Sequence, residues 1–218
     1  MISRCRAALP PWPARILRSS VTAVCFAGTL GVTLTLLHLV TPPVRDGWLA
    51  WSSTNLVNLA DHPVGAMIAS AFLAQSNSTA WIALSLISLA VIGRVLGNVR
   101  AAVLVAAAHI GATAVSEGIL WYRIGRGLEP VAARHVIDVG PSYVVIGALA
   151  AGIAYGTWPG RLVSVVGFAL LAPQVFLGLT QWELSSVGHA CSVVIGLTLG
   201  CPLRLWRGRR GRRSEPGG

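Results

Sequence analysis

The spacing of apolar and polar residues along the chain predicts six helices that cross a membrane. Six apolar stretches reach roughly 17 residues or more, the length that an α-helix needs to span the hydrocarbon core. A seventh apolar run, at 63–74, is too short to cross. We expect it to lie in the interface or to fold against the bundle, as part of a long first loop. The spanning stretches are 21–40, 80–96, 101–121, 142–158, 162–179 and 187–203.

The composition of the chain agrees with this pattern. Of its 218 residues, 54% are hydrophobic and only 11% are charged, which is the balance of a polytopic membrane protein and not of a soluble domain. We therefore predict an all-α, polytopic membrane protein with three parts. These are a basic N-terminal segment (1–19), a six-helix membrane domain (20–205) and a basic tail (206–218).

All 17 basic residues are arginine, and their distribution predicts the orientation of the chain. With both termini in the cytoplasm, 13 of the 17 fall on the inner side, and only Arg45, Arg123, Arg126 and Arg134 fall outside. Basic residues favour the cytoplasmic side, so we predict a multi-pass protein of a bacterial plasma membrane with both termini inside. The net charge of +10 then reflects topology and contact of the tail with anionic lipids. Nucleic acid is not an expected partner.

A serine and a histidine open two of the predicted helices at matching depth. Ser142 follows Gly140-Pro141 at the start of the fourth helix, and His189 opens the sixth. At ~1.5 Å per residue, Ser142 lies about 24 Å and His189 about 22 Å above the inner ends of their helices. Polar side chains are costly in lipid and usually functional there. Serine and histidine together can supply a nucleophile and its general base.

Small residues recur at four-residue intervals in the same two helices. Such a ridge lets two helix backbones approach closely, which a hydrogen bond between the serine and the histidine would require. We expect the fourth and sixth helices to pack there. The small residues are Gly147 and Ala151 in the fourth helix, and Ser192, Gly196 and Gly200 after the histidine in the sixth.

Together these segments resemble the rhomboid family of intramembrane serine proteases. That family has a six-helix core, a Gly-x-Ser motif at the start of helix four, and a histidine in helix six followed by small residues. The resemblance covers approximately residues 20–205 and implies a rhomboid-like bundle in which Ser142 is the nucleophile and His189 the general base. It implies cleavage of transmembrane protein clients near the outer membrane face, without a cofactor or metal.

Three positions depart from the family's pattern. Active rhomboids carry a histidine and an asparagine four residues apart in helix two, which help to bind the oxyanion, and here only Asn77 is available. The glycine that usually follows the serine is Tyr143, and the aromatic residue that usually stacks on the histidine is Ile146. The alternative function is therefore an inactive rhomboid-like protein that binds transmembrane clients. The candidates for an oxyanion site or cavity are Gly140, Tyr143, Asn77 and Glu117.

Three further polar residues have structural interpretations beside functional ones. Glu117 falls in the outer layer of the third helix, where we expect an ion pair with Arg123 or Arg126 and, as the alternative, an orienting contact with the histidine. Asp138 is expected to cap the fourth helix, or else to join the polar layer. His109, near the middle of the membrane, is expected to make an interhelical hydrogen bond.

Overall fold

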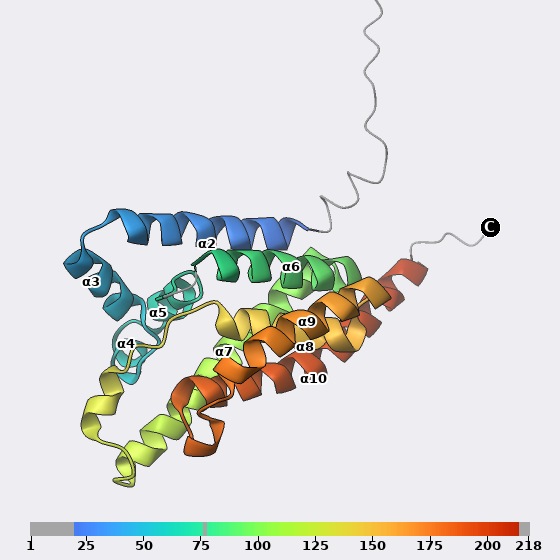
Figure 1. The fold of residues 1–218 in the computed structure, drawn as a ribbon. Coiled ribbons are helices and arrows are strands. Elements are labelled where there is room, and N and C mark those ends of the chain that lie inside the picture. The colour runs from blue at the N-terminus through green and yellow to red at the C-terminus, as the bar shows by residue number, and fades with distance from the viewer. Residues whose placement is uncertain (1–19, 76–77, 214–218) are drawn as a thin grey trace, which may run out of the picture.

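The computed structural model describes residues 20–75 and 78–213, and these ranges are helical with no strand (Figure 1). Four helices are long and apolar enough to cross a membrane, and a shorter apolar helix, α8, lies among them. The all-α membrane bundle predicted from the sequence is confirmed. Its main helices are α2 (Val21–Leu39), α6 (Ser78–Leu96), α7 (Asn98–Gly125), α8 (Ser142–Tyr155), α9 (Trp158–Val175) and α10 (Leu184–Arg213).

The helix bounds differ from the apolar stretches because polar residues continue several helices. The third stretch, 101–121, becomes the longer α7, which runs from Asn98 to Gly125. The fifth, 162–179, begins earlier, at Trp158, and its helix ends at Val175. Hydropathy marks the part of a helix that lies in lipid, while backbone hydrogen bonds decide where the helix ends.

The first loop folds into three short helices at one end of the bundle (Figure 1). Proline lies in the first turn of α3 (Pro42–Ser52) and of α5 (Pro63–Ser70), where its missing N–H costs no hydrogen bond. In α4 (Leu56–Asp61), the side chain of Asn55 caps the helix by accepting from the N–H of Asn58 at 2.9 Å. The apolar run at 63–74 thus forms α5 and the turn after it, and it packs against the bundle as expected.

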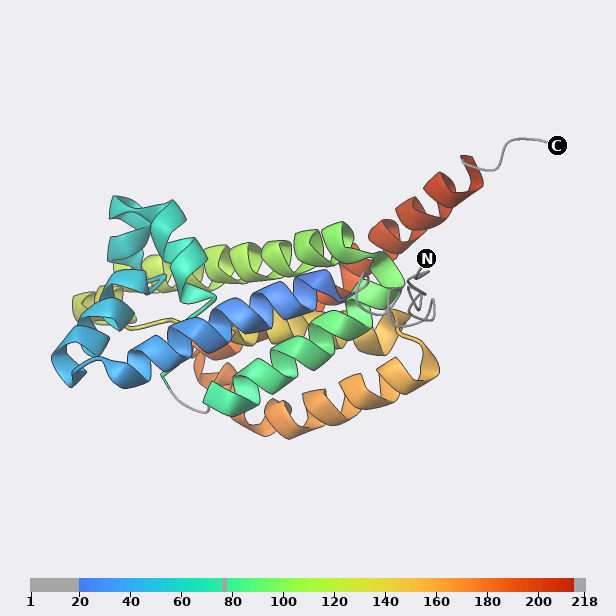
Figure 2. The ribbon, with the colours of Figure 1, turned by 90° about the horizontal axis from the view of Figure 1, so that it is seen from above.

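Helix α8 lies at the centre of the bundle, with α6, α7, α9 and α10 around it (Figure 2). Every residue from Tyr143 to Gly152 is buried. By contrast, α2 buries a single stripe against its neighbours and leaves large apolar side chains such as Val32 exposed. Exposed apolar side chains on a helix of spanning length are suited to contact with lipid tails.

The small residues of α8 and α10 mark a close approach of the two backbones. A Cβ atom added to Gly196 would overlap the carbonyl oxygen of Gly147, and one added to Gly147 would lie 2.7 Å from the Cβ of Ala108 on α7. Gly200 faces the ring of Tyr155 in the same way. Three helices therefore meet at this level without room for a larger side chain.

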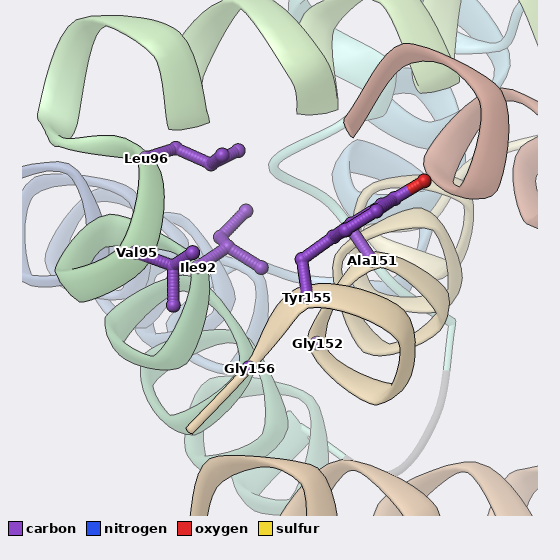
Figure 3. A pocket seen from close by; sticks show the side chains of 7 residues that line it. All are labelled: Ile92, Val95, Leu96, Ala151, Gly152, Tyr155 and Gly156. Atoms are coloured by element: carbon purple, nitrogen blue, oxygen red, sulfur yellow. The ribbon is translucent and has the colours of Figure 1, made fainter. Parts of the chain in front are cut away.

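Side chains of α6 and α8 surround a narrow gap close to the turn between α8 and α9 (Figure 3). The ring of Tyr155 lines this gap, and its hydroxyl points away from α6 and donates to the carbonyl of Leu197 on α10. Neither Ser142 nor His189 belongs to this contact. The residues of the contact are Ile92, Val95, Leu96, Ala151, Gly152, Tyr155 and Gly156.

The ends of the helices separate into two groups (Figures 1 and 2). The start of α2, the turn between α6 and α7, and the turn between α8 and α9 lie together at one end. The helices α3 to α5 and the short 3-10 helix η1 (Val131–His135) lie at the other. The orientation predicted from the arginine distribution requires such a grouping of the helix ends.

Candidate functional site

Tyr143 lies at the centre of a polar layer that it forms with His109, Asp138 and His189. Its ring is 2% exposed and meets the ring of His189 edge-on, with 5.2 Å between ring centroids. Its hydroxyl donates to Oδ2 of Asp138 at 3.0 Å. On a further side lies the ring of His109, 6.1 Å away between centroids. Tyr143 thus links α7, α8, α10 and the segment before α8.

Gly188, the residue before His189, makes room for the ring of Tyr143. A Cβ atom at Gly188 would overlap the ring and hydroxyl of Tyr143, so the tyrosine crosses α10 where it has no side chain. Tyr143, the residue directly after Ser142, is thus one of two aromatic neighbours of His189, and the other is Phe176, at 6.4 Å between ring centroids. The position four residues after the serine, Ile146, is fully buried and belongs to the apolar cluster between α8 and α9.

His189 is oriented by the end of helix α9. Its Nδ1 lies 2.9 Å from the carbonyl oxygen of Val175, which is in the last turn of α9, where carbonyls lack intrahelical partners. A carbonyl only accepts, so Nδ1 carries the proton and Nε2 keeps a lone pair. Nε2 is buried and has no hydrogen-bond partner among the described residues. This tautomer and orientation suit a general base.

Ser142 is the first residue of α8 and is half-buried. Pro141 occupies the N-cap position of α8. The first backbone bond of α8 runs from the N–H of Val145 to the carbonyl of Pro141 at 2.9 Å. The N–H groups of the three residues before Val145 thus precede that bond. In the described part of the chain, no hydrogen bond joins Ser142 to His189.

Asp138 ties the first loop to the start of α8. Its carbonyl accepts from the N–H of Thr54 at 3.0 Å, and its own N–H donates to Oγ of Ser53 at 2.9 Å. Its carboxylate accepts from Tyr143 and, at 3.4 Å, from Oγ1 of Thr54. Burial raises the pKa of Asp138, while these two hydrogen bonds lower it in part. The expected cap of α8 is wrong, because Asp138 is drawn into the polar layer.

A pair of substitutions at Asp138 tests the importance of this link. Asp138→Ala removes the acceptor of the buried Tyr143 hydroxyl, while the Thr54 hydroxyl keeps the backbone carbonyl of residue 138 at 3.1 Å. We therefore expect unfolding to become easier by about 1–3 kcal/mol. Asp138→Asn keeps an acceptor oxygen and should retain most of the stability. Thermal unfolding in detergent micelles measures both variants. Equal midpoints for alanine and asparagine would contradict a hydrogen-bonding role of the carboxylate.

Glu117 is 2% exposed, and neither carboxylate oxygen has a partner among the described residues. The expected ion pair is wrong. Arg123 instead pairs with Glu129 at 2.9 Å, and the guanidinium of Arg126 lies over the ring of Tyr122. Side chains six residues apart point to different faces of a helix, so Arg123 cannot follow Glu117 into the bundle. Glu117 remains a candidate residue for an oxyanion site or a cavity.

His109 makes the interhelical hydrogen bond expected of it. Its Nε2 lies 2.9 Å from the carbonyl oxygen of Met67 and 3.1 Å from Oγ of Ser70, both on α5. The carbonyl of Ser70 in turn accepts from the N–H of Gly140 at 2.9 Å. Gly140 has a φ of +156°, which side-chain-bearing residues rarely adopt. The first loop thus supports both α7 and the start of α8.

Two candidate residues from the sequence remain, Asn77 and Ser192. Asn77 lies outside the described residues. Ser192 is fully buried, and its Oγ has no partner among the described residues. The sequence did not indicate the roles of Ser53, Thr54 or Ser70. Their partners are distant along the chain, and no local pattern pairs them.

A family model described as a rhomboid-like protein matches residues 15–211. The match spans nearly the whole chain, so the chain belongs to the rhomboid-like family. It includes the first loop and the helices from α2 to α10, the last of them up to residue 211. No curated protein and no solved structure matches the chain.

Proposed function

We propose that this protein is an intramembrane serine protease that cleaves client transmembrane segments near the outer membrane face. The observation that carries the proposal is the state of His189. Its Nδ1 is engaged by the carbonyl of Val175, which leaves a buried Nε2 without a partner among the described residues. The residue before His189 is Gly188, which the ring of Tyr143 covers. A base held in this way, close to the start of α8, is suited to activate Ser142.

The proposed reaction uses groups of α8 and α10. Oγ of Ser142 attacks the client carbonyl carbon while Nε2 of His189 takes the hydroxyl proton. The imidazolium returns this proton to the leaving amine, and water then hydrolyses the acyl ester. The backbone N–H groups at the start of α8, before the first helical bond, are the donors that can face the oxyanion, assisted by the helix dipole.

The alternative is a non-catalytic protein that binds transmembrane clients in the same layer. Two observations favour it: no hydrogen bond joins Ser142 to His189 in the described part of the chain, and the ring of Tyr143 packs against the histidine. In this function, the polar layer would pair with polar groups of a client without chemical change. Hydrogen bonds between helices are an established means of association in lipid.

A fluorophosphonate probe separates the two functions. It reacts with an activated serine, so the purified protein should label, while Ser142→Ala and His189→Ala should not. Gel fluorescence measures the labelling, and thermal unfolding checks that each variant is folded. A folded wild-type protein that never labels would exclude the protease and leave client binding.

The cellular setting belongs to the same proposal. Both termini lie in the cytoplasm of a bacterial cell, transmembrane proteins are the clients, and the basic C-terminal tail contacts anionic lipids. This placement is supported by the arginine distribution and by the grouping of helix ends into two sets. Protease protection of tags at each terminus, in spheroplasts and in inverted vesicles, measures it.

A further inference from the structure

We propose that the end of α9 is a positioning element for the proposed reaction, and that Phe176 is the side chain through which it holds His189. This role deepens the proposed function and rests on it. Two contacts join His189 to the end of α9. One is a hydrogen bond to a backbone carbonyl, and the other is a contact between two rings.

The carbonyl of Val175 is free to accept from His189 because α9 ends there. Its partner in a continued helix would be the N–H of Leu179, which instead donates to the carbonyl of Phe176 at 3.1 Å. Nδ1 of His189 lies 2.9 Å from the Val175 oxygen. A single hydrogen bond leaves an imidazole ring free to tilt about the bonded nitrogen. The side chains around the ring therefore decide the direction of Nε2.

Two aromatic rings restrict this tilt. Tyr143 on α8 and Phe176 at the end of α9 both meet His189 edge-on, at 5.2 Å and 6.4 Å between ring centroids. Edge-to-face pairs attract each other at about 4.5–7 Å. The ring of Tyr143 is buried and is held at its hydroxyl by Asp138. Phe176 supplies the second ring, from the same turn of chain as the carbonyl that orients His189.

Phe176 also fixes the position of the Val175 carbonyl. Pro173, near the end of α9, has no N–H to donate, so this end has one backbone hydrogen bond fewer. Packing must hold it instead, and the ring of Phe176 lies 5.9 Å from that of Phe168 and against the apolar cluster of α8 and α9. Loss of the Phe176 ring therefore loosens both contacts with His189.

Cleavage of a client peptide by the full-length Phe176→Ala variant tests this role. The substitution misplaces Nε2 but removes no group that reacts, so we expect kcat to fall roughly 10–10²-fold, the cost of a misplacement of about 1 Å, with KM nearly unchanged. Phe176→Tyr keeps the ring and should retain most of the activity. Phe26→Ala is the matched control, because Phe26 is also half-buried and its ring pairs with Phe72. It should leave kcat unchanged.

Nuclear magnetic resonance of isotope-labelled histidine gives a readout that does not depend on cleavage. The signals of His189 are those missing from His189→Asn. We expect the Nδ1–H tautomer alone in the wild-type protein and in Phe176→Tyr, and a mixture of tautomers in Phe176→Ala. A wild-type tautomer in Phe176→Ala, or an unchanged kcat, would overturn the positioning role while the protease stands. A wild-type protein that never cleaves or labels would overturn the proposed function, and the tautomers would still show whether Phe176 holds His189.

Discussion

The His189→Asn variant is expected to keep its fold and to cleave a client transmembrane peptide roughly 10²–10⁴-fold more slowly, the usual contribution of a general base. The asparagine amide can take the place of the Nδ1 donor and maintain the hydrogen bond to the carbonyl of Val175. It offers no basic nitrogen at the position of Nε2. The substitution therefore separates the orienting bond from proton transfer.

Cleavage of a fluorogenic client peptide in micelles measures this loss, and thermal unfolding measures the fold. His135→Asn is the matched control, because His135 lies exposed in η1, and its replacement should leave cleavage unchanged. If His189→Asn retained activity within threefold of the wild-type protein, the histidine would not be the base. An equal loss of cleavage in His135→Asn would show that substitutions at the end of the bundle that carries η1 lower activity whether or not they remove the base.

Replacing Gly196 by alanine is expected to destabilise the protein by about 1–3 kcal/mol, the usual cost of overpacking. The added methyl group would overlap the backbone carbonyl oxygen of Gly147. No rotamer change relieves a clash between Cβ and backbone, so α8 and α10 must separate. Because these helices carry Ser142 and His189, labelling by the fluorophosphonate probe should also fall.

Gly118→Ala is the control for this substitution. Gly118 lies in α7 with nothing within 4 Å of an added Cβ, so alanine should be tolerated or should stabilise the helix by roughly 0.5–1 kcal/mol. Thermal unfolding of the two variants in the same detergent makes the comparison. A neutral Gly196→Ala variant would show that α8 and α10 do not depend on this contact.

The three-dimensional arrangement around His189 bears on two departures from the family's pattern, Tyr143 and Ile146. In the sequence, Tyr143 replaces the usual glycine and Ile146 the usual aromatic residue. In the structure, Tyr143 itself provides the ring against His189, and Gly188 makes room for it. The oxyanion pair of helix two has no such replacement among the described residues, and the backbone at the start of α8 is the available donor set.

The sequence by itself determined the helical class and the apolar segments that build the bundle, and it predicted a similar depth for Ser142 and His189. These properties depend on hydropathy, charge and the fixed rise of a helix, all of which are local along the chain. The structure decided which side chains meet: Asp138 with Thr54, His109 with Met67, and Glu117 with no arginine. Such contacts depend on the rotation of each helix about its axis and on the path of the first loop. Packing between distant segments sets both, and so it was tertiary structure that placed Tyr143, and not Ile146, beside the histidine.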